Sequence, residues 1–89
     1  MIPSVGRIVH YRLSEQDAAL INQRRAAGNG QGNSVAAGDV FPLMITRTWG
    51  DHEGSAVNGQ VFLDGDDSLW VTSATEGDGI RQWFAPPRV

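Results

Sequence analysis

The sequence predicts a mainly β fold: a small antiparallel barrel or curled sheet of about five strands, SH3-like in outline, with one α-helix inserted after the first strand. Two observations predict this fold. Short segments rich in β-branched and aromatic residues alternate apolar and polar side chains, and turn residues separate them. One segment near the start instead carries helix-forming residues between helix start and stop signals. The 89 residues fit a single domain, residues 1–89.

A first strand is expected over residues 5–13, because apolar and polar side chains alternate there. The alternation places two sets on opposite faces, with Val9, Tyr11 and Leu13 on one and Ile8, His10 and Arg12 on the other. A helix is expected over residues 15–27. Ser14 provides its N-cap, Asp17 follows three residues later, and Gly28 provides the C′ residue. The apolar face of this helix is narrow and consists of Ala18, Leu20 and Ile21, with a small contribution from Ala27.

Residues 28–39 form a Gly-rich loop that the composition predicts to be flexible. Loops of about 12 residues are uncommon in compact domains and are usually either functional or disordered. The alternative is that the backbone N–H groups of its glycines bind an anion. The loop is not a P-loop, because no Gly-Lys-Ser/Thr follows it.

Four further strands are expected over residues 40–49, 57–63, 69–75 and 80–84, with polar turns between them. Pro42 cannot donate a hydrogen bond to a neighbouring strand, so the start of the second strand is expected at an edge of the sheet. In the third and fourth strands one face receives Val61, Leu63, Leu69 and Val71, and the other receives Phe62 and Trp70.

Phe62 and Trp70 are large aromatic residues on a sheet face that is expected to be polar. The helix can cover them through Leu20 and Ile21. Otherwise they form an exposed apolar patch of the kind that marks an interface.

The charge composition restricts the classes of partner. The net charge is −3, and the Lys+Arg count of 7 consists of arginine alone, without a basic run. Generic nucleic-acid binding is therefore disfavoured, whereas a local cluster of arginines can still bind an anionic small ligand. No apolar run approaches the roughly 18 residues that span a bilayer, and no signal-peptide pattern opens the sequence, so we expect an intracellular protein that does not bind membranes.

The composition also bears on stability. The chain has no cysteine, so neither disulfides nor thiolate-bound zinc can stabilise it. A domain of this size is marginally stable, and self-association is the remaining common source of stability. A homo-oligomer is therefore expected.

Catalytic and metal-binding patterns are weak. The histidines are His10, in a strand, and His52, in a turn between Asp51 and Glu53. The run Asp64-Gly65-Asp66-Asp67 begins like a calcium loop, but Leu69 and Thr75 stand where that loop requires Gly and Glu. We therefore expect a non-enzymatic protein with no catalytic residues, no cofactor and no metal site.

Aromatic and arginine side chains are the remaining candidates for binding. Trp combines a large apolar surface with an N–H donor and is enriched in binding hot spots. We expect one tryptophan in the core and at least one at an interface. The candidate interface residues are Phe62, Trp70, Trp49, Trp83, Arg47 and Arg81, and Arg7 and Arg12 lie on strands near these aromatics.

Three segments resemble a family of small proteins encoded by tailed phages and prophages of actinobacteria. They are residues 4–11 (SVGRIVHY), residues 57–65 (VNGQVFLDG) and the C-terminal segment from Trp83 to Pro86-Pro87-Arg88-Val89. Relatives often end in Trp-x-Trp-Pro, whereas this chain has Trp83-Phe84-Ala85-Pro86. The family has no assigned activity, so the resemblance implies a biological setting, the host cytoplasm or the virion, and agrees with the lysine-free composition.

These observations lead to one expected function and two alternatives. The leading expectation is a phage accessory protein in the host cytoplasm that binds a host protein or a small ligand during infection, as a homo-oligomer. The first alternative is a structural component of the virion, such as a capsid decoration or head–tail protein. The second is a sponge for a nucleotide signal, because arginine and tryptophan side chains suit a phosphate and a base.

Overall fold

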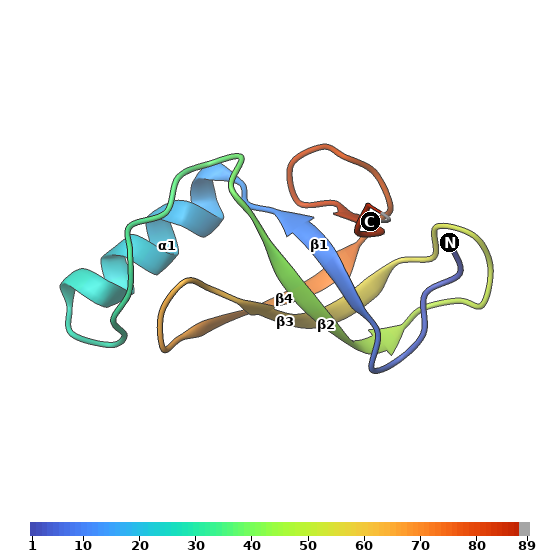
Figure 1. The fold of residues 1–89 in the computed structure, drawn as a ribbon, viewed down its shortest axis with the longest axis horizontal. Coiled ribbons are helices and arrows are strands. Elements are labelled where there is room, and N and C mark those ends of the chain that lie inside the picture. Colours follow the sequence, from blue (N-terminus) through green and yellow to red (C-terminus); the bar gives the residue numbers. More distant parts are fainter. Residues whose placement is uncertain (88–89) are drawn as a thin grey trace.

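The structure, a computed structural model, describes residues 1–87, so Arg88 and Val89 of the C-terminal segment lie outside it. Its elements in chain order are β1 (Ile8–Arg12), α1 (Glu15–Ala26), β2 (Val40–Thr48), β3 (Val57–Phe62), β4 (Ser68–Ala74) and β5 (Trp83–Phe84). The strands form one antiparallel sheet in the order β4-β3-β2-β1-β5 (Figure 1). The predicted mainly β fold, with one helix after the first strand, is confirmed. The sheet is not closed into a barrel, because β4 and β5 form its two edges within residues 1–87.

The expectation that Pro42 marks a sheet edge is wrong, because β2 is the central strand. The regular pairing of β2 with β3 begins one residue later, where Leu43 faces Val61. On the other side of β2, the Ile45 N–H donates to the Arg7 carbonyl over 2.9 Å, so the backbone groups of Ile45 point away from β3. Because this direction alternates along an antiparallel strand, the nitrogen of Pro42 points toward β3. Pro42 is therefore tolerated in a central strand because it lies just beyond the end of the β2–β3 ladder.

One face of the sheet carries the hydrophobic core. Alternate residues of the strands supply it, as the sequence pattern predicts. The largest fully buried side chains are Trp83, Tyr11, Leu13, Ile21, Leu43, Ile45, Val9, Val57 and Val61. The other face, which we call the outer face, points away from this core.

Helix α1 begins with the predicted cap. The Ser14 hydroxyl accepts a hydrogen bond from the Asp17 N–H, and the Asp17 carboxylate accepts from the Ser14 N–H, both over 3.0 Å. The same carboxylate accepts from the Tyr11 hydroxyl over 2.8 Å, so the helix start is tied to β1. Burial of the phenol raises the pKa of Tyr11, and this hydrogen bond to Asp17 raises it further.

The helix buries Ile21 in the core, but Leu20 is 46% exposed. Figure 1 shows α1 beyond one end of the sheet, beside the turn between β3 and β4. Phe62 and Trp70 remain exposed. The helix therefore does not cover Phe62 and Trp70, and the two side chains form an exposed apolar patch. No helix in residues 1–87 is long and apolar enough to cross a membrane.

The Gly-rich loop that follows α1 runs along the β3–β4 turn. Its Gly32 forms an isolated antiparallel bridge with Gly65, and backbone hydrogen bonds join Asn33 to Asp64 and Asp66 to Gln31. A Cβ atom on Gly32 would lie 2.3 Å from the Asp64 carbonyl oxygen. The two backbones can approach this closely only because both bridging residues are glycine.

Candidate functional site

The outer face of the sheet is the candidate site, and one row of side chains crosses four of its strands. Ile8 on β1 faces Met44 on β2, Met44 faces Gln60 on β3, and Gln60 faces Trp70 on β4. Directly facing residues on one side of an antiparallel pair lie about 4.5–5.5 Å apart at Cβ. The row therefore brings together residues that are far apart in the sequence.

Phe62 extends this row into a patch. It faces Ser68 on β4, two residues from Trp70, so the two aromatic residues are diagonal neighbours. Trp70 is 62% exposed and Phe62 is 48% exposed. An aromatic side chain buries about 150–250 Å² when fully covered, so these two rings alone leave about 200 Å² exposed. We call the set Ile8, Val40, Pro42, Met44, Phe62 and Trp70 the outer apolar patch.

The patch is bordered by few charges. None of the five strands contains Asp or Glu, so the acidic residues among residues 1–87 all lie in the helix, turns and loops. The only charged side chain near the patch on β1 is Arg12. Its guanidinium donates to the carbonyl oxygens of Asp78 (2.8 Å) and Gly38 (3.0 Å) and lies 5.7 Å from the centroid of the Phe84 ring.

Arg47 and Trp49 form a separate pair at the far end of β2. The Arg47 guanidinium lies over the Trp49 ring, 4.9 Å from its centroid, and Trp49 is 56% exposed. The indole Nε1 donates to Asn58 Oδ1 over 2.9 Å, and the same oxygen accepts from the Ser73 N–H over 2.8 Å. Asn58 thus joins the end of β2 to a residue of β4 whose φ is 55°. The pair lies beyond the β-bulge that separates Ile45 from Arg47.

The six candidate residues from the sequence therefore fall into different environments. Phe62 and Trp70 lie together in the outer apolar patch, and Arg47 and Trp49 stack on each other. Trp83 is fully buried, and its Nε1 donates to the Ser55 carbonyl over 3.3 Å. It is a core residue, so it lies outside any surface site. Arg81 is exposed in the turn before β5, and its backbone N–H donates to the Arg12 carbonyl over 2.8 Å.

Sequence reasoning missed four residues of the patch: Ile8, Val40, Pro42 and Met44. The alternation in the first strand assigns Ile8 to the face opposite Val9, which is correct. What the sequence lacks is the strand order, and with it the register that places Ile8 and Met44 in line with Trp70.

The histidines lie apart. His10 is half-buried, with its ring edge against Phe84 at a centroid distance of 5.4 Å. His52 is exposed in the turn after β2. Over residues 1–87 no group of three His, Asp or Glu side chains is arranged to hold a metal ion, and the described part of the chain encloses no pocket.

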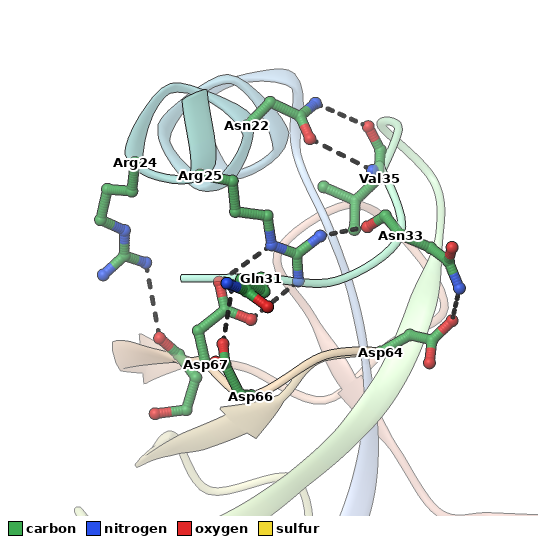
Figure 2. Close-up of polar contacts among 10 residues, drawn as sticks. Asn22, Arg24, Arg25, Gln31, Asn33, Val35, Asp64, Asp66 and Asp67 are labelled. Atoms are coloured by element: carbon green, nitrogen blue, oxygen red, sulfur yellow. Dashed lines mark hydrogen bonds and ion pairs between the residues drawn. The ribbon is translucent and has the colours of Figure 1, made fainter. Parts of the chain in front are cut away.

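The acidic turn between β3 and β4 binds the chain's own groups (Figure 2). Asp67 accepts two hydrogen bonds from Arg25, from Nε over 3.0 Å and from Nη2 over 2.8 Å. Asp66 accepts from the Gln31 N–H over 2.7 Å, and Asp64 accepts from Asn33 Nδ2 over 2.7 Å. Arg25 Nη1 also donates to the Asn33 carbonyl. Asp64 and Asp66 therefore hold the Gly-rich loop against the turn, and Asp67 joins the turn to α1.

The Arg25–Asp67 pair changes the titration of both groups. Hydrogen bonding to Arg25 lowers the pKa of Asp67, and hydrogen bonding to Asp67 raises the pKa of Arg25. The two side chains are 8% and 12% exposed. The pair is thus a structural contact between α1 and the β3–β4 turn.

No protein-family model matches the chain, and no curated protein and no solved structure was found to match it. The resemblance to small phage proteins accordingly remains an expectation from the sequence.

Proposed function

We propose that this protein is a non-enzymatic binding module that uses the outer apolar patch to bind an apolar surface of another protein. The observation that carries the proposal is the pairing of Trp70 and Phe62 as exposed diagonal neighbours on an open sheet face. Hot spots of protein interfaces are enriched in tryptophan and depend on fully desolvated central contacts. Contiguous exposed apolar patches on folded domains mark sites of interaction with other proteins, membranes or ligands.

The chemistry around the patch supports a protein partner. An interface core is depleted in charged residues, and the strands beneath this patch contain no acidic residue. Gln60 and Ser68, which lie between the aromatic residues, supply uncharged polar groups for a small number of hydrogen bonds. Ser68 Oγ already donates to Gln60 Oε1 over 3.3 Å, which orients both side chains.

The sequence resemblance supplies a setting for the proposal. A phage accessory protein in the host cytoplasm would use the patch to bind a host protein during infection. A virion component would use it to bind a capsid or tail protein. Both roles use the outer apolar patch. One experiment therefore tests whether the patch binds a protein, and a second one distinguishes the cytoplasmic role from the virion role.

Affinity capture from an actinobacterial lysate, followed by mass spectrometry, tests the surface. The double variant Ile8→Thr/Phe62→Thr removes apolar area from the patch while keeping residues that favour strands. Trp49→Thr is the matched control, because it removes an exposed ring outside the patch. We expect the wild type and Trp49→Thr to capture the same protein and the double variant to lose it. Capture that is equal for all three chains, or no capture by the wild type, contradicts the proposal.

Mass spectrometry of purified phage particles tests the setting. Stoichiometric peptides of this chain in the particle favour the virion role, and their absence favours the accessory role in the cytoplasm.

A further inference from the structure

We propose that two copies of this chain associate through the outer edge of β4, pairing antiparallel about a two-fold axis at Trp70, so that the two sheets become one. This inference goes beyond the proposed function, because it concerns an edge instead of a face and its partner is a second copy of the chain.

The centre of this edge is open, although Arg24 of α1 reaches its first residue, Ser68, and a β-bulge lies at its C-terminal end. Within residues 1–87, β4 pairs with β3 alone. Natural edge strands are blocked by Lys, Pro, inward-pointing charges or bulges. Residues 68–72 read Ser-Leu-Trp-Val-Thr and contain no charge and no proline. The register against β3 shifts after Val71, so Thr72 and Ser73 form a β-bulge opposite Asn58, and the φ of Ser73 is 55°. A regular, uncharged edge of high β-propensity therefore runs from residue 68 to residue 71, and the bulge follows it.

The backbone groups that face this edge follow from the ladder with β3. The Leu63 N–H donates to the Asp67 carbonyl over 3.4 Å, so residue 67 directs its backbone groups toward β3. In an antiparallel ladder this direction alternates along the strand, so Leu69 and Val71 also bond to β3. Ser68, Trp70 and Thr72 then direct their N–H and C=O groups to the open edge. The Ser68 carbonyl accordingly accepts from Arg24 Nη2, which comes from α1, over 3.4 Å and keeps its second lone pair.

The edge is complementary to itself when Trp70 lies on the two-fold axis. Ser68 then faces Thr72 of the second copy, Leu69 faces Val71, and Trp70 faces Trp70. Each of these pairs is favourable: hydroxyl with hydroxyl, apolar with apolar on the core side, and aromatic with aromatic on the outer side. The pairs at Trp70 and at Ser68/Thr72 are those whose backbone groups point outward, so each exchanges two N–H···O bonds.

Charge does not oppose this arrangement. The five strands contain no acidic residue, and β4, the strand that meets its own copy, contains no charged side chain. The dimer would also place the two outer apolar patches side by side, with the Trp70 rings between them. An aromatic pair at the axis and a doubled apolar surface are consistent with a small domain that gains stability from association.

Charged substitutions at positions 68 and 72 test the register directly. In Ser68→Lys/Thr72→Lys, lysine faces lysine at both ends of the paired strands, and in Ser68→Glu/Thr72→Glu, glutamate faces glutamate. Both variants are expected to weaken the homodimer because like charges face each other. An equal mixture is expected to form a heterodimer, because each lysine then faces a glutamate. Ser68→Glu/Thr72→Lys pairs opposite charges within a homodimer and is the matched control.

Native mass spectrometry and sedimentation at a series of concentrations give the readout, and thermal unfolding shows that each variant is folded. We expect dissociation constants of the Lys/Lys and Glu/Glu homodimers about 10- to 100-fold above that of the Glu/Lys control, with recovery in the mixture. A monomeric wild type, or equal dimerisation of all variants, overturns the inference. Neither result affects partner capture through Ile8 and Phe62, so failure here is distinguishable from failure of the proposed function.

Discussion

Arg25 and Asp67 form a two-point contact between α1 and the turn that joins β3 to β4, with Nε and Nη2 of the guanidinium each donating to a different carboxylate oxygen. Arg25 also donates to the Asn33 carbonyl, so one side chain links the helix, the Gly-rich loop and the turn (Figure 2). A planar guanidinium can satisfy such a set of acceptors, whereas a lysine ammonium cannot reproduce the two-point geometry.

Asp67→Asn is expected to lower the free energy of unfolding by about 1–3 kcal/mol, because Arg25 loses a charged acceptor in a largely buried position. Asp51→Asn is the control, since that carboxylate is fully exposed in the turn after β2. Urea unfolding of both variants measures the difference. Equal stabilities would show that the ion pair contributes nothing.

The contribution of this pair is expected to depend on pH. The pKa of Asp67 lies below its ordinary value of 3.8 in the folded chain. Its stabilising effect is therefore complete above pH 3.8 and is lost as the pH falls through the lower folded-state pKa. The gap in stability between the wild type and Asp67→Asn should be constant near neutral pH and close in acid. A gap that widens in acid contradicts this assignment.

Gly65→Ala is expected to detach the Gly-rich loop. A Cβ atom at position 65 would lie 2.2 Å from the Gln31 carbonyl oxygen, and backbone atoms cannot move aside as a flexible side chain can. Amide hydrogen exchange should become faster at Asn33 and Asp66, which donate hydrogen bonds in this contact. Gly6→Ala provides the comparison: it meets open space and adds only the strain of a positive φ of 89°. Unchanged exchange in Gly65→Ala would show that the loop does not depend on this approach.

Truncation of Trp83 is expected to destabilise the chain far more than truncation of Trp70. Trp83→Ala removes a fully buried ring and should cost about 3–5 kcal/mol. Trp70→Ala removes a mostly exposed ring and should change the stability of the monomer by about 0.5 kcal/mol or less. Denaturant unfolding at concentrations where the chain is monomeric measures both.

Ser14→Ala is expected to destabilise the chain by about 1 kcal/mol, because the Asp17 N–H loses its acceptor at the helix start. Circular dichroism during urea unfolding measures the loss. Ser34→Ala, an exposed serine of the loop, is the control.

The sequence predicted those features that depend on neighbouring residues. The alternation of apolar and polar residues correctly separated Phe62 and Trp70 from the core side of β3 and β4. Ser14 and Asp17 correctly marked the start of α1, since capping needs only residues three positions apart.

Features that depend on distant residues were not predictable in this way. Pro42 lacks the N–H group that a central strand normally donates, but the regular pairing of β2 with β3 ends beside it, at Leu43. The β-bulge after Ile45 shifts the register of β2 against β3, and no local pattern in the sequence marks its position. The outer apolar patch needs the register of four strands, which no local pattern contains.

The position of β1 between β2 and β5 has a kinetic consequence. Tyr11 pairs with Trp83, so the sheet is complete only when a late segment of the chain returns to an early one. Closing so long a loop costs entropy before any contact repays it, and chains dominated by such distant contacts fold in about milliseconds to seconds instead of microseconds. During that delay the edge strand β4 can pair with other unfolded or partly folded chains. The refolding yield should therefore fall as the protein concentration rises.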